Sequence, residues 1–314
     1  MSSHLRRAAS VFPALLLGIA CQATTGCDHN DAKLAERFDG ERAWKGLEAQ
    51  VAFGPRPSGT PANESCRAWI ETELRGMGLE PKRETFKSGT PAGEIEFANV
   101  YADFASKDPK ANWILLGSHF DTKRMPFPFV GANDGASSTA VLIEVARALV
   151  AGGPREFTYR FVFFDGEEAL RHDWVDPDNT YGSRHHAERL KNSGRNLDVK
   201  AFVLLDMVGD KDLKLTRDTY SEGRFVDVFF GAARKHGLGA HVDGKSMEVR
   251  DDHLSFMNVG IRSIDLIDFE YGPNNGHWHT AEDVVANCSK ESLTAIGRIV
   301  LHGLPDLEAL LAGR

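Results

Sequence analysis

The 314-residue sequence lacks a long hydrophobic run, a cluster of basic residues and all but four cysteines. The absence of long apolar runs excludes a membrane protein with several spanning helices. The absence of a lysine and arginine stripe argues against a nucleic-acid-binding protein, because phosphate recognition needs concentrated positive charge. What is present, 42% hydrophobic and 26% charged residues with a net charge of −8, is the composition of a folded globular protein rather than a collagen or a disordered chain.

The first residues have the pattern of an export leader. A basic start precedes the apolar segment 11–20, and a segment of about ten residues is half of what a membrane span requires. Cys21 and Cys27 each follow a small residue, as at the cleavage site of a bacterial lipoprotein. We therefore expect residues 1–27 to be a leader and the protein to be exported, either secreted or held in the periplasm or cell envelope. Lipidation of one of these cysteines is the only membrane attachment we expect, and cleavage near Ala20 without lipidation is the alternative.

Two cysteines remain in the body of the chain, Cys66 and Cys288. When an exported protein contains just two cysteines, they more often form a disulfide than a reactive site. We therefore expect a disulfide between them, which requires that the fold bring the two within bonding distance.

Hydrophobic periodicity predicts alternating strands and helices over residues 28–314, which we interpret as a single catalytic domain. Thr60 and Ser289 are typical helix N-caps, and Pro61 is favourable at a first helical position. The predicted strands are continuous runs of β-branched and aromatic residues, typical of a parallel sheet covered on both faces. We therefore expect a three-layer α/β/α sandwich around a central mixed, mostly parallel sheet. The expected strands are 98–104, 113–117, 159–164, 201–206 and 261–267, and the expected helices begin at Pro61, span 137–150, 181–190 and 224–236, and begin after Ser289.

Acidic residues and histidines gather just after the predicted strands. Since the carboxyl ends of parallel strands share one edge of a sheet, we expect these side chains to meet there. Taken one at a time, each has an ordinary explanation: Asp134 lies in an Asn-Asp-Gly turn, and a glutamate pair is favourable in the first turn of a helix. The group comprises His119 and Asp121 after the second strand, Asp165, Glu167 and Glu168 after the third, Asp206 after the fourth, and His277 and His279 after the last, with Asp134 in a turn that opens a helix.

Taken together, the histidines and carboxylates form a mixed nitrogen and oxygen ligand set without a thiolate. Such a set fits zinc or another borderline ion at a catalytic site better than a closed structural zinc site. The adjacent pair Glu167-Glu168 is the most informative element, because one carboxylate can bind the metal while its neighbour moves protons beside it.

Five segments of the chain form a recognisable set of motifs: FGPRPSGT over 53–60, SHFDTK over 118–123, GANDGA over 131–136, FFDGEEA over 163–169 and WHT over 278–280. These motifs resemble those of the zinc aminopeptidase superfamily, and within it those of the animal-type glutaminyl cyclases (glutaminyl-peptide cyclotransferases). The cyclase branch is favoured by Lys123, by Trp174, by the segments 181–185 and 251–253, and by Trp278 beside a histidine.

The resemblance implies a metal site. Asp134, Glu168 and His279 match the ligands of a single zinc ion. His119 and Asp206 match positions that hold a second zinc ion in the aminopeptidases, whereas the cyclases of this family work with one. His119 is therefore a candidate for a second metal or for a supporting position.

The resemblance also implies an activity, the conversion of an N-terminal glutamine of a peptide or protein to pyroglutamate with release of ammonia. Glu167 would be the general acid and base, and Asp206 with Asp251 would form a hydrogen-bonded acidic network beside it. Trp174 and Trp278 would line the substrate pocket.

Two other readings of the same residues stay open. In an aminopeptidase, two zinc ions would share Asp134, and Glu167 would deprotonate a water that attacks a peptide carbonyl. A non-enzymatic exported binding protein on a degenerate peptidase fold is the third, and the complete set of ligands and both glutamates argue against it. One departure from the animal cyclases is Asp265, which stands where they carry a pocket histidine.

Overall fold

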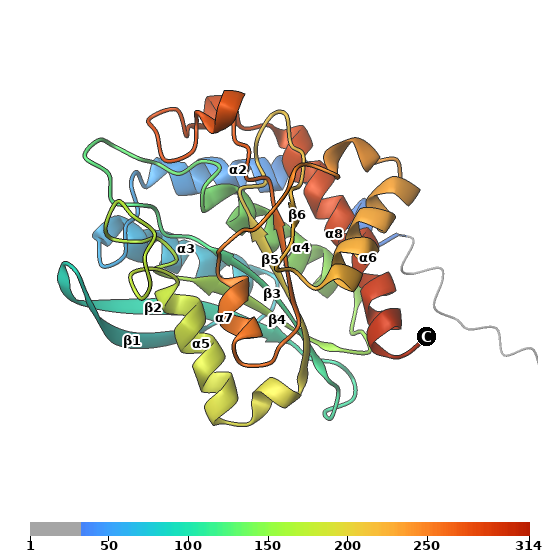
Figure 1. Ribbon diagram of the computed structural model, residues 1–314. Coiled ribbons are helices and arrows are strands. Elements are labelled where there is room, and N and C mark those ends of the chain that lie inside the picture. Colours follow the sequence, from blue (N-terminus) through green and yellow to red (C-terminus); the bar gives the residue numbers. More distant parts are fainter. Residues whose placement is uncertain (1–32) are drawn as a thin grey trace, which may run out of the picture.

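The computed structural model describes residues 33–314, so the expected leader with Cys21 and Cys27 lies outside the described residues. In the part of the chain that is described, helices pack on both faces of a six-stranded sheet, which confirms the expected three-layer arrangement (Figure 1). No helix of residues 33–314 combines the length and the apolar character that a membrane span needs.

The central sheet consists of β1 (Lys82–Thr90), β2 (Gly93–Phe104), β3 (Trp113–His119), β4 (Thr158–Phe164), β5 (Val199–Asp206) and β8 (Ser263–Ile267). Their order is β1-β2-β4-β3-β5-β8, with β4, β3, β5 and β8 parallel and the β1-β2 hairpin antiparallel at one edge. All five expected strands are confirmed. The sequence did not predict β1, because only one of its nine residues is buried and an apolar signal is missing. Two short strands, β6 (Arg217–Asp218) and β7 (Ser246–Met247), form a separate pair.

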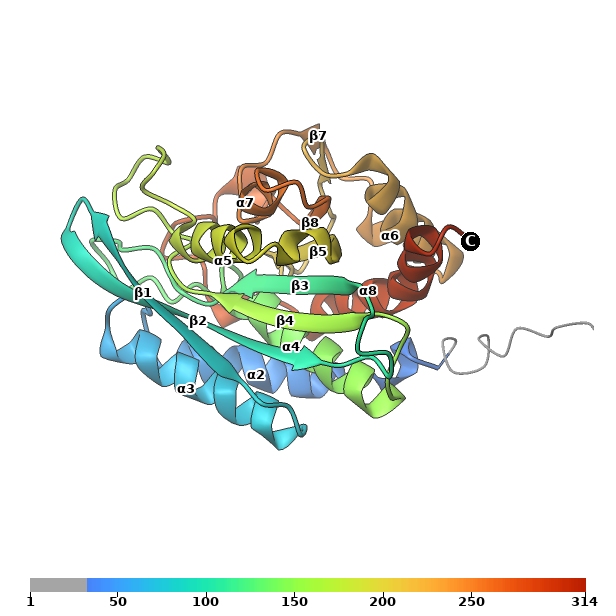
Figure 2. The ribbon, with the colours of Figure 1, turned by 90° about the horizontal axis from the view of Figure 1, so that it is seen from below.

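One face of the sheet is covered by α2 (Gly40–Ala52), α3 (Pro61–Gly76), α4 (Ala136–Gly152) and α8 (Lys290–Leu311), and the other by α5 (Tyr181–Asn192) and α7 (His253–Met257) (Figure 2). α6 (Gly223–Lys235) packs against α8. The expected caps are confirmed, since Thr60 accepts a hydrogen bond from the backbone of Asn63 and Ser289 one from the backbone of Ser292. Single 3-10 turns lie at Ala35–Arg37, Arg195–Leu197, Gly239–His241, Pro273–Asn275 and Val285–Asn287.

The expected disulfide between Cys66 and Cys288 is wrong, because both residues are buried free thiols. The fold directs them to different neighbours: the Sγ atom of Cys66 lies 3.9 Å from Gln50 Oε1 in α2, and that of Cys288 lies 3.9 Å from the Tyr271 hydroxyl. Burial raises the pKa of the Cys66 thiol to about 12 and raises that of Cys288 as well. Each cysteine therefore serves as a small apolar core residue.

Candidate active site

The carboxyl ends of three parallel strands and two loops bring the predicted metal ligands together at one edge of the sheet. These ligand side chains are buried, apart from that of His279, which is 16% exposed. The contributing residues are His119 at the end of β3, Glu167 and Glu168 after β4, Asp206 at the end of β5, Asp134 in the turn before α4, and His279 in the loop between β8 and α8.

Asp134 lies at the centre of this group, between two histidines. Its Oδ1 atom is 3.2 Å from His119 Nε2, and its Oδ2 atom is 3.2 Å from His279 Nε2. His119 Nε2 is also 3.1 Å from Asp206 Oδ1, and His279 Nε2 is 3.3 Å from Glu168 Oε1. Two sets of potential ligands therefore share Asp134, and such a bridging carboxylate can serve one cation or two.

The chemistry of these atoms fits a divalent cation. The Oε1 atom of Glu168 is buried, receives no hydrogen bond and faces His279. Burial favours a neutral imidazole at His279, but Glu168 and Asp134 outweigh it and raise the pKa of His279 to about 10. The raised pKa of His279 reflects the negative charge that these carboxylates concentrate at the site, and a bound cation would neutralise that charge. Imidazole nitrogen with carboxylate oxygen is the ligand set of catalytic zinc sites.

Two aspartates form hydrogen bonds with the backbone of the segments that carry the candidate metal ligands. Asp121 accepts hydrogen bonds from the backbone N–H groups of Glu167 and Glu168, at 3.1 and 3.3 Å. Asp283 accepts them from the backbone N–H groups of Asn133 and Asp134, at 2.7 and 3.2 Å. The sequence placed Asp121 at a strand end without a role and gave no reason to single out Asp283, whose partner segment lies 150 residues away.

Arg56, from the first motif, is fully buried and ties the loops of the site together. Within residues 33–314 its guanidinium has no carboxylate hydrogen-bond partner and donates to backbone carbonyls instead, which is an unusual use of a buried cation. The acceptors are the carbonyls of Gln50, Gly54, Phe120, Val130 and Gly131. The conformation of the turn that carries Asp134 therefore depends on a residue about 80 positions earlier in the sequence.

Glu167 differs from its neighbour Glu168 in its surroundings. Burial raises the pKa of Glu167 well above its usual value, the charge of His119 opposes this shift, and Asp251, Glu168 and Asp252 add to it. The closest basic atom is His119 Nδ1, 3.9 Å from Glu167 Oε2. A buried carboxyl group whose pKa is raised in this way is suited to take up and return a proton.

The two other predicted catalytic acids lie in the same electrostatic cluster. Asp206 accepts hydrogen bonds through Oδ1 from His119 and from the backbone N–H of Met207. Burial together with the charge of Asp206 raises the pKa of Asp251 to about 7, and Asp251 Oδ2 is buried without a hydrogen-bond partner. The described residues show no direct hydrogen bond between Asp206 and Asp251, so the two acids are coupled through charge.

Asp252 and His253 follow Asp251 in the sequence. Both are buried, and the sequence predicted no separate role for either. Both carboxylate oxygens of Asp252 lack a hydrogen-bond partner, as do both oxygens of Asp265, the departure from the animal cyclases. His253 lies between Asp218, at 3.2 Å from Nε2, and Asp265, at 3.9 Å from Nδ1. Burial and the charges of Asp251, Asp206 and Asp218 raise the pKa of Asp265 well above its usual value, which favours a protonated Asp265.

Of the two predicted pocket tryptophans, Trp278 lies directly at the metal ligands. Its indole stacks on His279 at a centroid distance of 4.2 Å and packs against Phe269 at 5.1 Å. Trp174 lies half-buried in the loop between β4 and α5, next to Val175, which is 61% exposed. The ring contacts found among residues 33–314 do not include Trp174, so its role stays a prediction.

Lys123, singled out by the sequence, contacts the same cluster from within the protein. It is 2% exposed, and its Nζ atom lies 3.4 Å from Glu168 Oε2 and 3.1 Å from the carbonyl oxygen of Ala169. One oxygen of Glu168 thus faces Lys123 and the other faces His279. This division orients the carboxylate and leaves one oxygen for a cation.

The similarity of this chain to known proteins is consistent with the geometry of the candidate active site. Residues 99–304 match peptidase family M28, and the chain belongs to that family. Within the family its similarity is to glutaminyl cyclases. It is 30% identical over 298 residues to a glutaminyl-peptide cyclotransferase-like protein of Bos taurus, with 85% of this chain and 76% of the relative covered.

Solved structures of glutaminyl cyclases are also similar to this chain. The crystal structure of an Acidobacteriales bacterium glutaminyl cyclase matches with a TM-score of 0.82 and 36% identity, covering 86% of this chain and 95% of that one. A Zn-dependent exopeptidase from Parabacteroides distasonis matches with a TM-score of 0.75 and 26% identity, covering 88% and 99%. The fold is thus shared by both chemistries that the sequence left open.

Proposed function

We propose that this chain is a zinc-dependent glutaminyl-peptide cyclotransferase that converts the N-terminal glutamine of peptides to pyroglutamate and releases ammonia. The observation that carries the proposal is the position of Glu167, a buried carboxyl with a raised pKa, next to the ligand set Asp134, Glu168 and His279. Similarity to glutaminyl cyclases over 85% to 86% of the chain supports it.

In the reaction the α-amine of the substrate attacks its own γ-amide carbon, a five-membered ring closes, and the bond to the amide nitrogen breaks. Zinc, when bound, supplies Lewis-acid polarisation of the γ-carbonyl group and stabilises the negative charge that develops on its oxygen. Glu167 takes a proton from the attacking amine and returns it to the departing nitrogen, which leaves as ammonia.

The surrounding acids keep this proton transfer possible near neutral pH. Burial raises the pKa of Glu167, and the negative charges of Asp251 and Asp252 add to this shift, so that Glu167 holds a proton more readily than an exposed glutamate does. Because the three carboxyl groups are coupled, they titrate together rather than as separate sites. Stacking on His279 fixes the indole ring of Trp278. We propose that this ring holds the glutamine side chain in its folded conformation, which reduces the entropic cost of cyclisation.

We propose a single zinc ion at Asp134, Glu168 and His279. In the second ligand set, the two residues beside the shared Asp134 are already hydrogen-bonded to each other, from His119 to Asp206 at 3.1 Å. Metal analysis of the purified protein by elemental mass spectrometry is expected to give about one zinc ion per chain. A value of two would favour the exopeptidase chemistry that the same ligands can support.

The assay that separates the two chemistries offers a Gln-peptide and a leucine anilide to the zinc-loaded protein. We expect ammonia release from the Gln-peptide, with appearance of a product lighter by one ammonia, and no cleavage of the anilide. Anilide cleavage without ammonia release would overturn the proposal in favour of an aminopeptidase, and inactivity on both substrates would support the binding-protein reading.

We also propose that the protein is exported, and that it is either secreted or attached to a membrane through lipidation of Cys21 or Cys27. The leader pattern over residues 1–27 supports this. Mass spectrometry of the mature N-terminus, on the wild type and on separate Cys21→Ser and Cys27→Ser variants, identifies the processing site. A mature chain that retains residues 1–27 would contradict export through this leader.

A further inference from the structure

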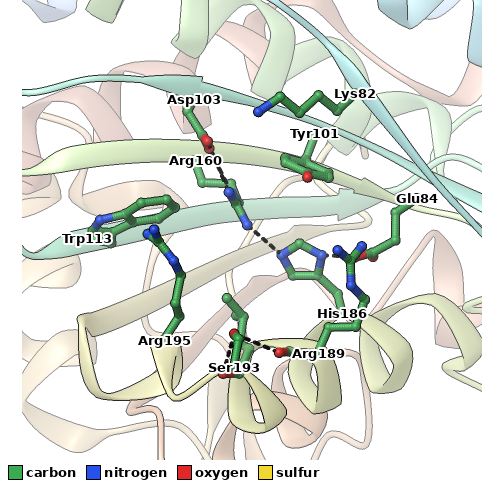
Figure 3. A pocket seen from close by; sticks show the side chains of 11 residues that line it. Lys82, Glu84, Tyr101, Asp103, Trp113, Arg160, His186, Arg189, Ser193 and Arg195 are labelled. Atoms are coloured by element: carbon green, nitrogen blue, oxygen red, sulfur yellow. Dashed lines mark hydrogen bonds and ion pairs between the residues drawn. The ribbon is translucent and has the colours of Figure 1, made fainter.

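A cleft of about 500 Å3 lies on the α5 side of the sheet, at the end of the strands opposite the active site (Figure 3). It is lined by Trp113, the first residue of β3, whereas His119 is the last residue of that strand. The two residues are six positions apart in an extended strand, which corresponds to about 20 Å. The cleft is therefore distinct from the site proposed above, and nothing in the proposed reaction uses it.

The floor of the cleft is a buried arginine in a fixed position. Arg160 is 8% exposed, and its guanidinium lies 4.3 Å from the ring centroid of Tyr101 and 4.7 Å from that of Trp113. Its Nε and Nη2 atoms donate to the two oxygens of Asp103, at 2.7 and 3.0 Å, and Nη1 lies 3.5 Å from His186 Nε2 (Figure 3). These contacts use three of the five donors of the guanidinium, and no residue of 33–314 accepts a hydrogen bond from the other two.

The carboxylates of the cleft are already neutralised by this network. Asp103 pairs with Arg160, and Glu84 accepts hydrogen bonds from His186 Nδ1, at 2.9 Å, and from Arg189. If these salt bridges served only to attach α5 to the sheet, the cleft would need no further cations. The lining, however, carries more positive charge than its two carboxylates neutralise.

Lys82 and Arg195 provide this excess charge at the mouth of the cleft. Neither forms an ion pair with any residue in the described part of the chain, and Arg195 lies 5.0 Å above the Trp113 ring. Four cationic side chains thus face two carboxylates, on a protein whose overall net charge is −8. Local positive charge on an acidic protein concentrates anions from solution.

We propose that this cleft is a binding site for a small multivalent oxyanion, a phosphate or a polycarboxylate. Guanidinium groups bind such anions through paired N–H donors, and the aromatic rings hold the arginines rigid so that little entropy is lost on binding. The volume matches that of small-molecule pockets. A cationic ligand is disfavoured by the net charge of the lining, and a purely apolar ligand would leave the guanidinium donors without partners.

Titration calorimetry of the intact zinc-loaded protein tests the site, with inorganic phosphate and citrate as separate ligands at constant ionic strength set by chloride. We expect saturable binding of at least one of them at one site per chain, with a Kd of about 1 mM or tighter. Saturation by phosphate alone would define a phosphate site, and saturation by citrate alone a carboxylate site.

A double variant, Lys82→Met with Arg195→Met, removes the two exposed unpaired cations and leaves the buried network intact. We expect its affinity for the same anion to fall at least tenfold. Arg262→Met is the matched control, because Arg262 is also an exposed arginine stacked on a ring, that of Phe225 at 5.2 Å, but lies outside the cleft. Its affinity is expected to equal that of the wild type, and circular dichroism checks that each variant is folded.

Trp113 provides an independent signal, since an anion beside the stacked arginines changes its surroundings. We expect an anion-dependent change in tryptophan fluorescence that disappears in Trp113→Phe. The proposal is overturned if neither anion saturates the wild type by about 10 mM, or if the double variant binds as tightly as the wild type. Cyclase activity does not enter this test, so its result is independent of the function proposed above.

Discussion

At the scale of single residues, the adjacent glutamates Glu167 and Glu168 show how position alone separates two identical side chains. Gly166 precedes them with a φ of 78°, and a Cβ atom there would lie 2.5 Å from the Phe97 ring, so only glycine permits the turn. Asp121 then fixes both backbone N–H groups. As a result Glu168 faces His279 and Lys123, whereas Glu167 faces the acidic cluster around Asp251.

Replacing Glu167 tests this division of roles. In Glu167→Gln we expect turnover of a Gln-peptide to fall by at least 100-fold, because the amide cannot carry the proton, while the zinc content stays near that of the wild type. Glu188→Gln, on the exposed side of α5, is the control for loss of one negative charge. Wild-type activity of Glu167→Gln would show that another group transfers the proton.

At the scale of secondary-structure elements, Asp165 connects three elements directly before the active-site turn. Its carboxylate accepts hydrogen bonds from Arg67 in α3 at 2.7 Å, from the backbone N–H of Ala98 in β2 at 2.9 Å, and from Ser58 at 2.7 Å and Asn63 at 3.1 Å. Arg67 is the only cation that pairs with this carboxylate in the described part of the chain. The position of Glu167 thus depends on the packing of α3 against the sheet.

Removing the cation of this buried pair is expected to be costly. Arg67→Met leaves the Asp165 carboxylate buried without a positive partner, which lowers the free energy of unfolding by about 3–5 kcal/mol. Urea unfolding followed by circular dichroism measures the change. The control is Arg75→Met on the same helix, where an exposed arginine pairs with Glu71 and about 0–1 kcal/mol is expected. Equal effects of the two substitutions would contradict a structural role for the buried pair.

The contact between α6 and α8 contains two stacked histidines and is expected to be sensitive to acid. The rings of His236 and His302 lie 3.7 Å apart and nearly parallel, and burial together with the charges of His236, Arg298 and Lys235 lowers the pKa of His302 to about 4. An unfolded histidine titrates near pH 6.5. Between about pH 6.5 and pH 4 the unfolded chain therefore binds a proton that the folded chain does not, and stability is lost as the pH falls.

Substitution of His302 removes this linkage. We expect the urea midpoint of His302→Gln to fall less between pH 7 and pH 5 than that of the wild type. His172→Gln, at an imidazole whose side chain is 93% exposed, provides the control and should keep the wild-type pH dependence. If both variants lose stability in parallel with the wild type, the stacked pair has no part in the acid sensitivity.

At the scale of the whole molecule, the parallel strands concentrate buried acids at one edge of an already acidic protein. Asp134, Glu167, Glu168 and Asp206 are all buried, and His119 and His279 balance only part of their charge. A bound cation is therefore expected to stabilise the fold as well as the reaction.

Metal removal tests this expectation. We expect a chelator to lower Tm by several degrees, since a ligand at about 1,000 times its Kd contributes about 4 kcal/mol. Zinc should restore the transition, whereas magnesium should not, because magnesium prefers an all-oxygen octahedral site. Asp134→Ala should give a Tm that does not respond to the chelator. A wild-type Tm that is unchanged by complete zinc removal would contradict the ligand set.

The sequence by itself determined five of the six strands of the central sheet, two helix caps and the types of ligand, because strand periodicity, capping and turn residues act over a few neighbouring positions. It also determined that acids and histidines follow the strands. Only the tertiary structure decided that Asp134 lies between two histidines, that Asp283 and Arg56 hold the loops, and that Cys66 and Cys288 face different neighbours. Those contacts join segments from tens to about 150 residues apart, and their distances depend on the path of the whole chain rather than on any local pattern. The cationic cleft has the same origin, since its lysine and arginines come from separate strands, from α5 and from the 3-10 turn that follows α5, and no spacing in the sequence marks them as a group.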